Sequence, residues 1–328
     1  MNELLHIAQH NLSSPMILCF LLGWIAAVIR SDLEFPEALS KALSLYLLFV
    51  IGFKGGVSLV SQSDLAAAAL TMLVAVALSF ALPWLAFALL RLTTRLDSRG
   101  CAAVAAHYGS ISIVTLVTAM QFLQDKQYPY EGYIAAVAAV METPAIVAGL
   151  IIAARFAKPE SSSEAVVLGT GKLIRKILSH SSLVLLLGAF VIGLLSGERG
   201  MHSIEGFVHG GFKGALCFFL LDMGLVAART FVGFRVLNWP VWLFALYMPL
   251  IGGGIGLLCG HWVGLSLGGK VLFAVLGASA SYIAVPAAMR MAMPRVPPSL
   301  YLTLALAVTF PFNVIIGIPL YLYLGQQL

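Results

Sequence analysis

Two short serine motifs carry the residues of this chain that are best suited to binding chemistry. The string YGSIS contains Ser110 and Ser112, and the string GASAS contains Ser279 and Ser281. Each motif lies about ten residues into an apolar stretch, which at about 1.5 Å per residue is near the middle of a bilayer. The Gly- and Ala-rich surroundings, with Pro286 after the second motif, predict that both helices break there.

A broken helix at that depth is suited to binding a small anion. The break leaves backbone N–H groups unpaired, which a bilayer tolerates only beside a protein-lined cavity or a ligand. The N-terminus of each following half-helix carries roughly half a positive charge. Two such termini, the four serine hydroxyls and the amides between them predict a socket for an anion of about one negative charge. The alternative is that the small residues only let helices pack closely.

Three polar side chains deep in other apolar stretches are candidate ligands for a cation. They are Glu142, Asp222 and Asn313. A carboxylate at such depth is costly unless it is paired, hydrated or bound to a cation. With the hydroxyls of Thr143 and Thr309, these side chains offer the hard oxygen ligands that Na⁺ would take, by analogy with other oxygen-coordinated ions. The alternative is that each is hydrogen-bonded to a helix break or a neighbouring helix.

Two basic residues are auxiliary candidates. His107, beside the first serine motif, is either a proton-linked group or a hydrogen-bond partner that orients its helix. The string GFKG occurs at 52–55 and at 211–214, and it places Lys54 and Lys213 about six residues from one end of their apolar stretches. A lysine at that depth reaches the headgroups by snorkelling, so Lys54 is either a snorkelling residue or a substrate-binding one.

The composition indicates which elements position these residues. The chain of 328 residues is 60% hydrophobic and only 10% charged, which is too little polar surface for a soluble globule. We therefore expect an all-α integral membrane protein, because about 20 apolar residues cross about 30 Å of hydrocarbon as a helix. Polar breaks separate ten such spans, at residues 15–30, 39–60, 65–92, 99–124, 131–156, 181–197, 207–228, 239–266, 268–293 and 299–326.

A long polar segment divides the ten spans into two sets of five. Residues 1–156 form the first predicted five-helix repeat, residues 157–180 form a loop, and residues 181–328 form the second repeat. Because each half has five spans, the second half enters the membrane from the opposite side, and a duplication here would be an inverted repeat.

Matched landmarks indicate the duplication better than the two GFKG strings do. The serine motifs align at an offset of 169 residues, and Gly23 aligns with Gly188 at an offset of 165. A similar register pairs Gly52 with Asp222. The GFKG strings are 159 residues apart and fall out of this register by about two helical turns.

The basic residues predict the topology. Most Lys and Arg residues lie in or beside the loops that follow the odd-numbered spans, and basic residues accumulate in cytoplasmic loops. Both termini are therefore predicted outside, and residues 157–180 cytoplasmic. The net charge of +5 is explained in this way without a nucleic-acid partner. The loop at 157–180 would lie on the inner leaflet or meet a soluble regulator.

Several strings together resemble the sodium-dependent bicarbonate transporter family of the SbtA type. They occur in both halves, and the resemblance covers nearly the whole chain, with departures concentrated in the central loop. The strings are IGFKGGVSL, AAHYGSISIVTL, METPAIVAG, FFLLDMGL, GASASYIAVPAAMR and PSLYLTLALAVTFPFNVIIGIPLYL.

The resemblance implies two inverted five-helix repeats, in which a core domain with broken fourth and ninth helices moves against a gate domain. It also implies a homotrimer in the lipid bilayer of a bacterial inner (plasma) membrane, with a PII-like protein as cytoplasmic regulator. Na⁺ would be the coupling ion, with no other cofactor and with Glu142, Asp222 and Asn313 as its candidate ligands. The positions implied to bind bicarbonate are Gly109, Ser110, Ile111, Ser112, Ser279, Ala280 and Ser281.

The expected function is therefore Na⁺/bicarbonate symport by alternating access. Carrying one negative charge inward costs about 2.3 kcal/mol per 100 mV, and one co-transported Na⁺ cancels that cost. One alternative is a sodium-coupled carrier of another small anion, such as a short carboxylate. A membrane enzyme using His107, Glu142 and Asp222 is a second alternative, which no HExxH or GxSxG string supports. A receptor that signals through the central loop is a third.

Overall fold

A computed structural model describes residues 13–60, 65–156, 181–232, 238–282 and 295–328, together with residues 285, 286, 289 and 293. The predicted cytoplasmic loop at 157–180 and part of the ninth predicted span lie outside the described residues. Within these ranges the chain is helical, and its one β-type pairing is a bridge between Tyr108 and Ala280.

The helices are α2 (Pro15–Val28), α3 (Glu37–Val60), α4 (Leu65–Thr93), α5 (Ser98–Ala105), α6 (Ile113–Asp125), α7 (Ile134–Phe156), α9 (Ser181–Ser203), η1 (Gly206–Gly210), α10 (Phe212–Val232), α11 (Trp239–Trp262), α12 (Leu267–Ala278), α14 (Pro298–Leu302), η3 (Thr303–Thr309), α15 (Phe310–Phe312), η4 (Asn313–Gly317) and α16 (Ile318–Gly325). The η elements are π-helical, with a wider turn than an α-helix.

Polar residues define where the shorter helices begin. Side-chain oxygens of Ser14, Asp97, Ser112 and Ser266 accept hydrogen bonds from the first-turn N–H groups of α2, α5, α6 and α12. Such caps satisfy donors that a helix start leaves unpaired. The cap at Ser112 makes α6 a separate helix from α5, so the fourth predicted span is broken as expected.

Seven of the described helical segments are long and apolar enough to cross a membrane. They correspond to predicted spans two, three, five, six, seven, eight and ten, and α2 and α12 are shorter apolar helices. Large apolar side chains stay exposed along them, among them Leu22, Leu195 and Trp262. Helices of this length with an apolar outer surface are typical of a multi-pass membrane protein.

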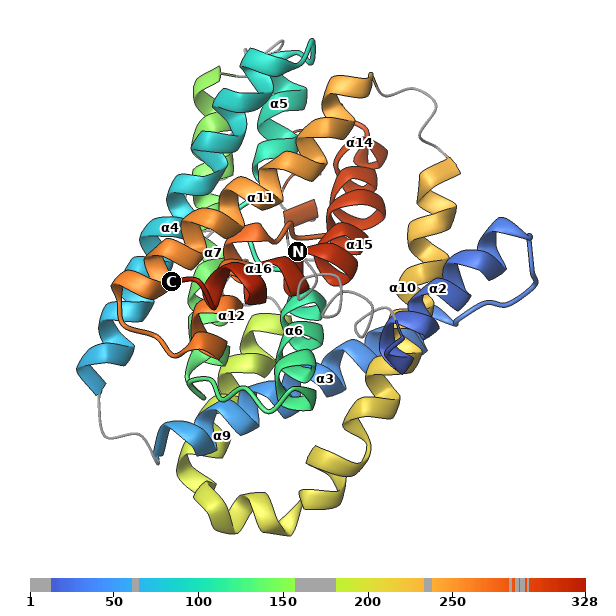
Figure 1. Ribbon diagram of the computed structural model, residues 1–328. Coiled ribbons are helices and arrows are strands. Elements are labelled where there is room, and N and C mark those ends of the chain that lie inside the picture. The colour runs from blue at the N-terminus through green and yellow to red at the C-terminus, as the bar shows by residue number, and fades with distance from the viewer. Residues whose placement is uncertain are drawn as a thin grey trace.

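The helices form two groups (Figure 1). In the first helix group α3 packs along α9, and α2 packs along α10. The second helix group contains α4 to α7, α11, α12 and the helical rod at 298–325, with α4 against α7 and α11 against α12. Contacts between the groups are fewer and join α10 with η3, and α3 and α9 with α7.

Glycines bring the backbones of α2 and α10 into direct contact. A Cβ atom added at Gly23 would collide with the carbonyl oxygen of Leu221, and one added at Gly224 would collide with that of Phe20. Small residues of this kind let membrane helices approach closely, because the helices gain little hydrophobic energy from each other in lipid.

The same arrangement joins α3 and α9. A Cβ atom at Gly193 would collide with the carbonyl oxygen of Phe53, and one at Gly56 with that of Phe190. Each helix pair thus has a glycine on each helix facing a carbonyl of the other, and α3 has a second one, Gly52, facing the carbonyl of Leu186. The two pairs are close geometric counterparts.

These contacts correct two alignments made from the sequence. Gly193, at an offset of 170 from Gly23, makes the equivalent contact, whereas the space around Gly188 is open. Gly56 of α3 matches Gly224 of α10 in the same way, at an offset of 168 residues. In this register the partner of Asp222 is Lys54, whereas the sequence alignment paired Asp222 with Gly52. For the expected repeat, these contacts favour this register over the one read from the sequence, where several Gly residues lie within one or two turns of each other.

We predict that Gly56→Ala destabilises the protein and that Gly188→Ala does not. The first change forces α3 away from α9, and overpacking of this kind costs about 1–3 kcal/mol. The second adds a methyl group where nothing lies within 4 Å. Thermal unfolding of the purified protein in detergent measures both. Equal melting temperatures for the two variants would contradict the assignment of the close contact.

Candidate functional site

The two serine motifs meet in space, where two non-helical segments cross. We call the segments 106–112 and 279–282 the crossing. Tyr108 and Ala280 form an antiparallel bridge, and the N–H of Ser281 donates to the carbonyl of His107 at 2.9 Å. Backbone groups freed by the fourth-span break are thus partly satisfied by the other half of the chain, as apolar surroundings require.

Gly109 lets the chain turn at the crossing. Its φ of 110° is a conformation that side chains disfavour. A Cβ atom here would lie 2.7 Å from Cδ of Pro83 and 2.9 Å from the carbonyl oxygen of Ser79. Both a backbone turn and close packing against α4, at its internal proline, therefore require glycine at this position.

Ser110 and Ser112 provide hydroxyl donors at the start of α6. The Ser110 side chain is fully buried, and within the described ranges its Oγ has no hydrogen-bond partner. The Oγ of Ser112 accepts from the N–H of Thr115 at 3.3 Å and from its Oγ1 at 2.9 Å. Neither bond uses the Ser112 proton, and the Tyr282 hydroxyl is a further group that interacts with Ser112. Ile111 lies between them and is buried.

The second motif contributes differently. The hydroxyl of Ser279 donates to the carbonyl of Val275 at 2.7 Å, which uses its one proton. Ser279 and Ser281 are both buried, and Ala280 is held by the bridge to Tyr108. Of the hydroxyls of Ser110, Ser112 and Ser279, those available to an anion thus belong to the first motif. Ser279 is the residue at which α12 ends, and its hydroxyl bonds back to that helix.

Asn313 lies at the end of α12 and presents an oxygen without a partner. Its Nδ2 donates to the carbonyl of Ala278 at 2.8 Å, whereas its Oδ1 is buried and unpaired among the described residues. It begins the π-helical turn η4, and such turns occur frequently at functional sites. The negative end of the α12 dipole and an amide oxygen together favour a cation here.

Glu142 is a buried carboxylate linked to the crossing through α4. It follows Met141 in α7, whose carbonyl accepts a hydrogen bond from Ser79 Oγ, and the Ser79 carbonyl lies 2.9 Å from where a Cβ atom of residue 109 would be. The Glu142 side chain is 5% exposed, and in the described part of the chain its Oε2 has no hydrogen-bond partner. A buried atom of this kind calls for an explanation such as an ion or water. Thr143, the next residue, is half-buried.

His107 and Thr309 hold the crossing in place. The Nδ1 of His107 pairs with the carbonyl of Ala103 at 2.7 Å, so Nδ1 carries a proton, and the ring stacks on Tyr301 at 4.4 Å. This geometry favours the helix-orienting interpretation of His107. Thr309 Oγ1 lies 2.9 Å from the Tyr108 hydroxyl.

Sequence reasoning missed Tyr108 and Ser79. Tyr108 is part of the first serine motif and supplies both the backbone bridge and a buried hydroxyl contact. Ser79, in α4, links that helix to α7 beside the crossing. The proximity of Ser79 to Pro83 was the signal that could have pointed to it, because a helix proline frees a carbonyl nearby.

Two predicted site residues belong to the first helix group. Asp222 of α10 is buried, and the polar groups that interact with it are Ser40 of α3 and Arg229. Lys54 of α3 has its Nζ 5.1 Å from the centre of the Phe212 ring. The structure therefore brings Asn313 to the crossing, and it places Asp222 and Lys54 in other surroundings.

The arrangement is suited to binding an anion beside a cation. The N-terminus of α6 directs positive charge and the hydroxyls of Ser110 and Ser112 toward the crossing, whereas the C-termini of α5 and α12 direct negative charge toward it. Among the described residues, no group of three or more His, Cys, Asp or Glu side chains could hold a metal ion.

Comparison with known proteins gives one family. The family model of the Na⁺-dependent bicarbonate transporter superfamily matches residues 15–326, which is nearly the whole chain. The match confirms at the level of the family what the motifs indicated. No curated protein matches the chain.

We predict that Gly109→Ala impairs the crossing more than Gly264→Ala impairs its own loop. Both positions have a positive φ, which alone costs of order 1–3 kcal/mol, but Gly264 has nothing within 4 Å of an added Cβ atom. Melting temperature and substrate uptake should both fall further in Gly109→Ala. A larger loss in Gly264→Ala would contradict the close packing at Pro83.

Proposed function

Because the chain belongs to the Na⁺-dependent bicarbonate transporter superfamily, we propose that it takes up bicarbonate together with Na⁺ by alternating access. The family supports a sodium-dependent carrier, and a carrier is not an enzyme. The observation that carries the finer proposal is the crossing. There a half-helix N-terminus and the Ser110 hydroxyl, which lacks a partner in the part of the chain that the structure describes, face two helix C-termini.

Bicarbonate would bind at Gly109 to Ser112 and approach Ser279 to Ser281. Backbone N–H groups at the start of α6 and two hydroxyls are donors that suit a compact oxyanion. Ser279, whose proton is already donated to Val275, would shape the socket without donating to the anion.

Sodium would bind on the opposite side of the crossing, with Asn313 and Glu142 as its first candidate ligands. Both have a buried oxygen that lacks a partner in the described part of the chain. Thr143 and Thr309 are further oxygen donors near them in sequence. We keep Asp222 as a third candidate, which would reach the ion only if the first helix group moves toward the second.

Symport has an energetic reason. One negative charge moving into a cell against an interior-negative potential costs about 2.3 kcal/mol per 100 mV, and one Na⁺ cancels this and adds its own gradient. Binding both ions at one crossing couples them, because each then favours the same occluded state.

The proposed architecture is ten spans in two inverted five-helix repeats. The glycine contacts of α2 with α10 and of α3 with α9 support it, since each contact is repeated when the two halves are exchanged. The first helix group would be the gate domain and the second the core domain that carries both breaks. Residues 1–156 and 181–328 would be the repeats.

We also propose a membrane topology, a cellular membrane and partners for this chain. The bias of basic residues supports outside termini and a cytoplasmic segment at 157–180 in a bacterial inner (plasma) membrane. The family resemblance supports a homotrimer and a PII-like partner on the cytoplasmic side.

Uptake of labelled bicarbonate into proteoliposomes tests the function. An inward Na⁺ gradient should stimulate accumulation at fixed pH, and an equal K⁺ gradient should not. Uptake of a short carboxylate but not of bicarbonate would support a sodium-coupled carrier and show that its substrate is a different anion. Absence of uptake for either anion would contradict the proposal.

We predict that Ser110→Ala raises the KM for bicarbonate about tenfold or more, as expected for one lost hydrogen bond to a charged group. Ser279→Ala is the matched control with a smaller rise, because that hydroxyl already donates to Val275. Initial uptake rates over a bicarbonate series measure both. An equal rise in the two variants would refute the division of roles.

We predict that Glu142→Gln weakens activation by sodium. The Na⁺ concentration for half-maximal uptake should rise about tenfold, which is about 1.4 kcal/mol of binding energy. Glu37→Gln, on an exposed side chain at the start of α3, is the control. Unchanged sodium activation in Glu142→Gln would remove that residue from the ion site.

A further inference from the structure

A cavity of about 230 Å³ lies between the two helix groups, away from the crossing. Its walls come from α3 and α9 to α10 of the first group and from α6 and α7 of the second. Its polar lining residues are Lys54, Ser58, Gln124, Tyr130 and His209. None of its lining residues is acidic.

Lys54 has no counter-charge in this cavity. Its Nζ lies over the Phe212 ring at 5.1 Å, and within the described ranges no carboxylate forms an ion pair with it. The charged group that influences it is the ammonium group of Lys213, and His209 lies close enough to interact with it. A lysine that is largely removed from solvent near a second ammonium group is destabilised unless an anion joins it.

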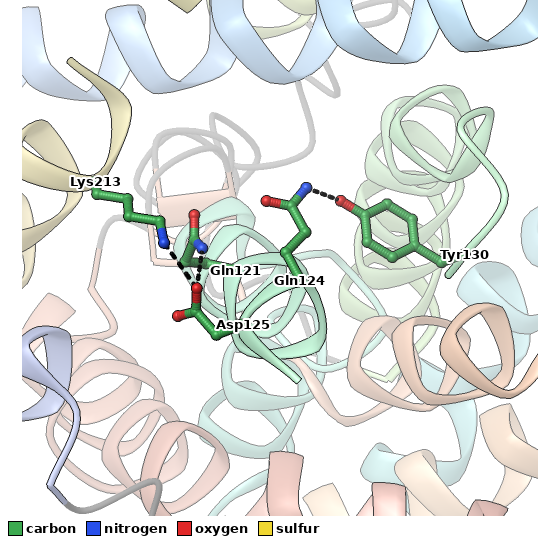
Figure 2. A network of polar contacts seen from close by, with 5 residues as sticks. All are labelled: Gln121, Gln124, Asp125, Tyr130 and Lys213. Atoms are coloured by element: carbon green, nitrogen blue, oxygen red, sulfur yellow. Dashed lines mark hydrogen bonds and ion pairs between the residues drawn. The ribbon is translucent and has the colours of Figure 1, made fainter. Parts of the chain in front are cut away.

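Asp125, the carboxylate that Lys213 contacts, is already paired. Asp125 forms an ion pair with Lys213 at 2.7 Å and accepts from Gln121 at 2.9 Å, as Figure 2 shows. Glu205 interacts electrostatically with His209. Within the described ranges, Lys54 therefore has no carboxylate as its ion-pair partner.

Tyr130 adds a second donor. Its hydroxyl accepts from Nε2 of Gln124 at 2.6 Å (Figure 2), so its own proton is free to be donated. Burial raises the pKa of Tyr130 to about 12, which keeps that proton in place at neutral pH. The Tyr130 side chain also lines the cavity.

We propose that this cavity is a second anion site, which binds a small monovalent oxyanion between the Lys54 ammonium group and the Tyr130 hydroxyl. Its volume holds an ion of bicarbonate size with a few waters, since one water occupies about 30 Å³ in the liquid. It is smaller than the pockets of about 300–1,000 Å³ that take drug-sized ligands.

The second site deepens the proposed function and rests on it for the identity of the anion. Lys54 and Lys213 lie near the predicted outer ends of their spans, so the site would collect anions on the outer side before they reach the crossing. Because its walls belong to both helix groups, movement of one group against the other would change its size.

Protection from alkylation tests binding without relying on transport. Ser58→Cys places a thiol in the cavity wall, and its reaction with N-ethylmaleimide is followed by mass spectrometry of the peptide that contains residue 58. Sodium bicarbonate should slow this reaction saturably, relative to sodium gluconate of equal ionic strength. Cys19, on α2, is the internal control whose rate should not change.

Lys54→Met in the Ser58→Cys protein should raise the bicarbonate concentration for half-protection about tenfold, as for loss of a hydrogen bond to a charged group. Lys126→Met is the matched control, because Lys126 also lies over an aromatic ring, that of Phe122 at 5.6 Å, but does not line the cavity. Met201→Cys provides a second reporter position if Ser58→Cys does not fold.

The outcomes separate the two proposals. Saturable protection that depends on Lys54 supports the second site, and it does so even if bicarbonate uptake is absent. Uptake without any protection overturns the second site and leaves the carrier intact. Protection that requires phosphatidylglycerol and is absent in phosphatidylcholine nanodiscs also overturns it, since a lipid headgroup would then occupy the cavity.

Discussion

The hydrogen bonding of backbone groups in apolar surroundings is the constraint on which the site depends. A break in a buried helix frees N–H and C=O groups that lipid cannot satisfy. Here the freed groups of 106–112 meet those of 279–281, through the bridge of Tyr108 with Ala280 and the bond from Ser281 to His107. Gly109 makes the turn possible, and the donors that remain unpaired are those offered to a ligand.

Close glycine contacts join helices within both groups. They join α2 with α10 and α3 with α9 in the first group, and α11 with α12 in the second, where Gly252 and Gly277 each face the carbonyl of the other. The second group also contains the crossing and its hydrogen bonds. Contacts between the groups are fewer. A carrier needs such a division, because each group must keep its own packing while the interface between them changes. The cavity at Lys54 lies at this interface.

The proposed duplication has diverged at the positions that carry charge. In the register set by the glycine contacts Lys54 is equivalent to Asp222, so one half has a cation where the other has a carboxylate. Asp222 interacts with Ser40 and Arg229, whereas Lys54 lies over an aromatic ring near the ammonium group of Lys213 and has no carboxylate partner among the described residues. Packing residues are kept in both copies because both need the same close approach, and residues that meet ions are free to differ.

The sequence by itself determined the class of protein, seven of the spans, the break at the first serine motif and the family, because hydropathy, caps and glycine are local properties of the chain. It did not determine which hydroxyls remain free. Ser110 has no partner among the described residues and Ser279 is bonded, although both belong to the same pattern. It also did not show that Gly193 rather than Gly188 makes the close contact, that Ser79 bonds to α7, or that Lys54 has no carboxylate partner within the described ranges. These depend on which helices lie side by side, and only the tertiary structure decides the partners of a buried polar group.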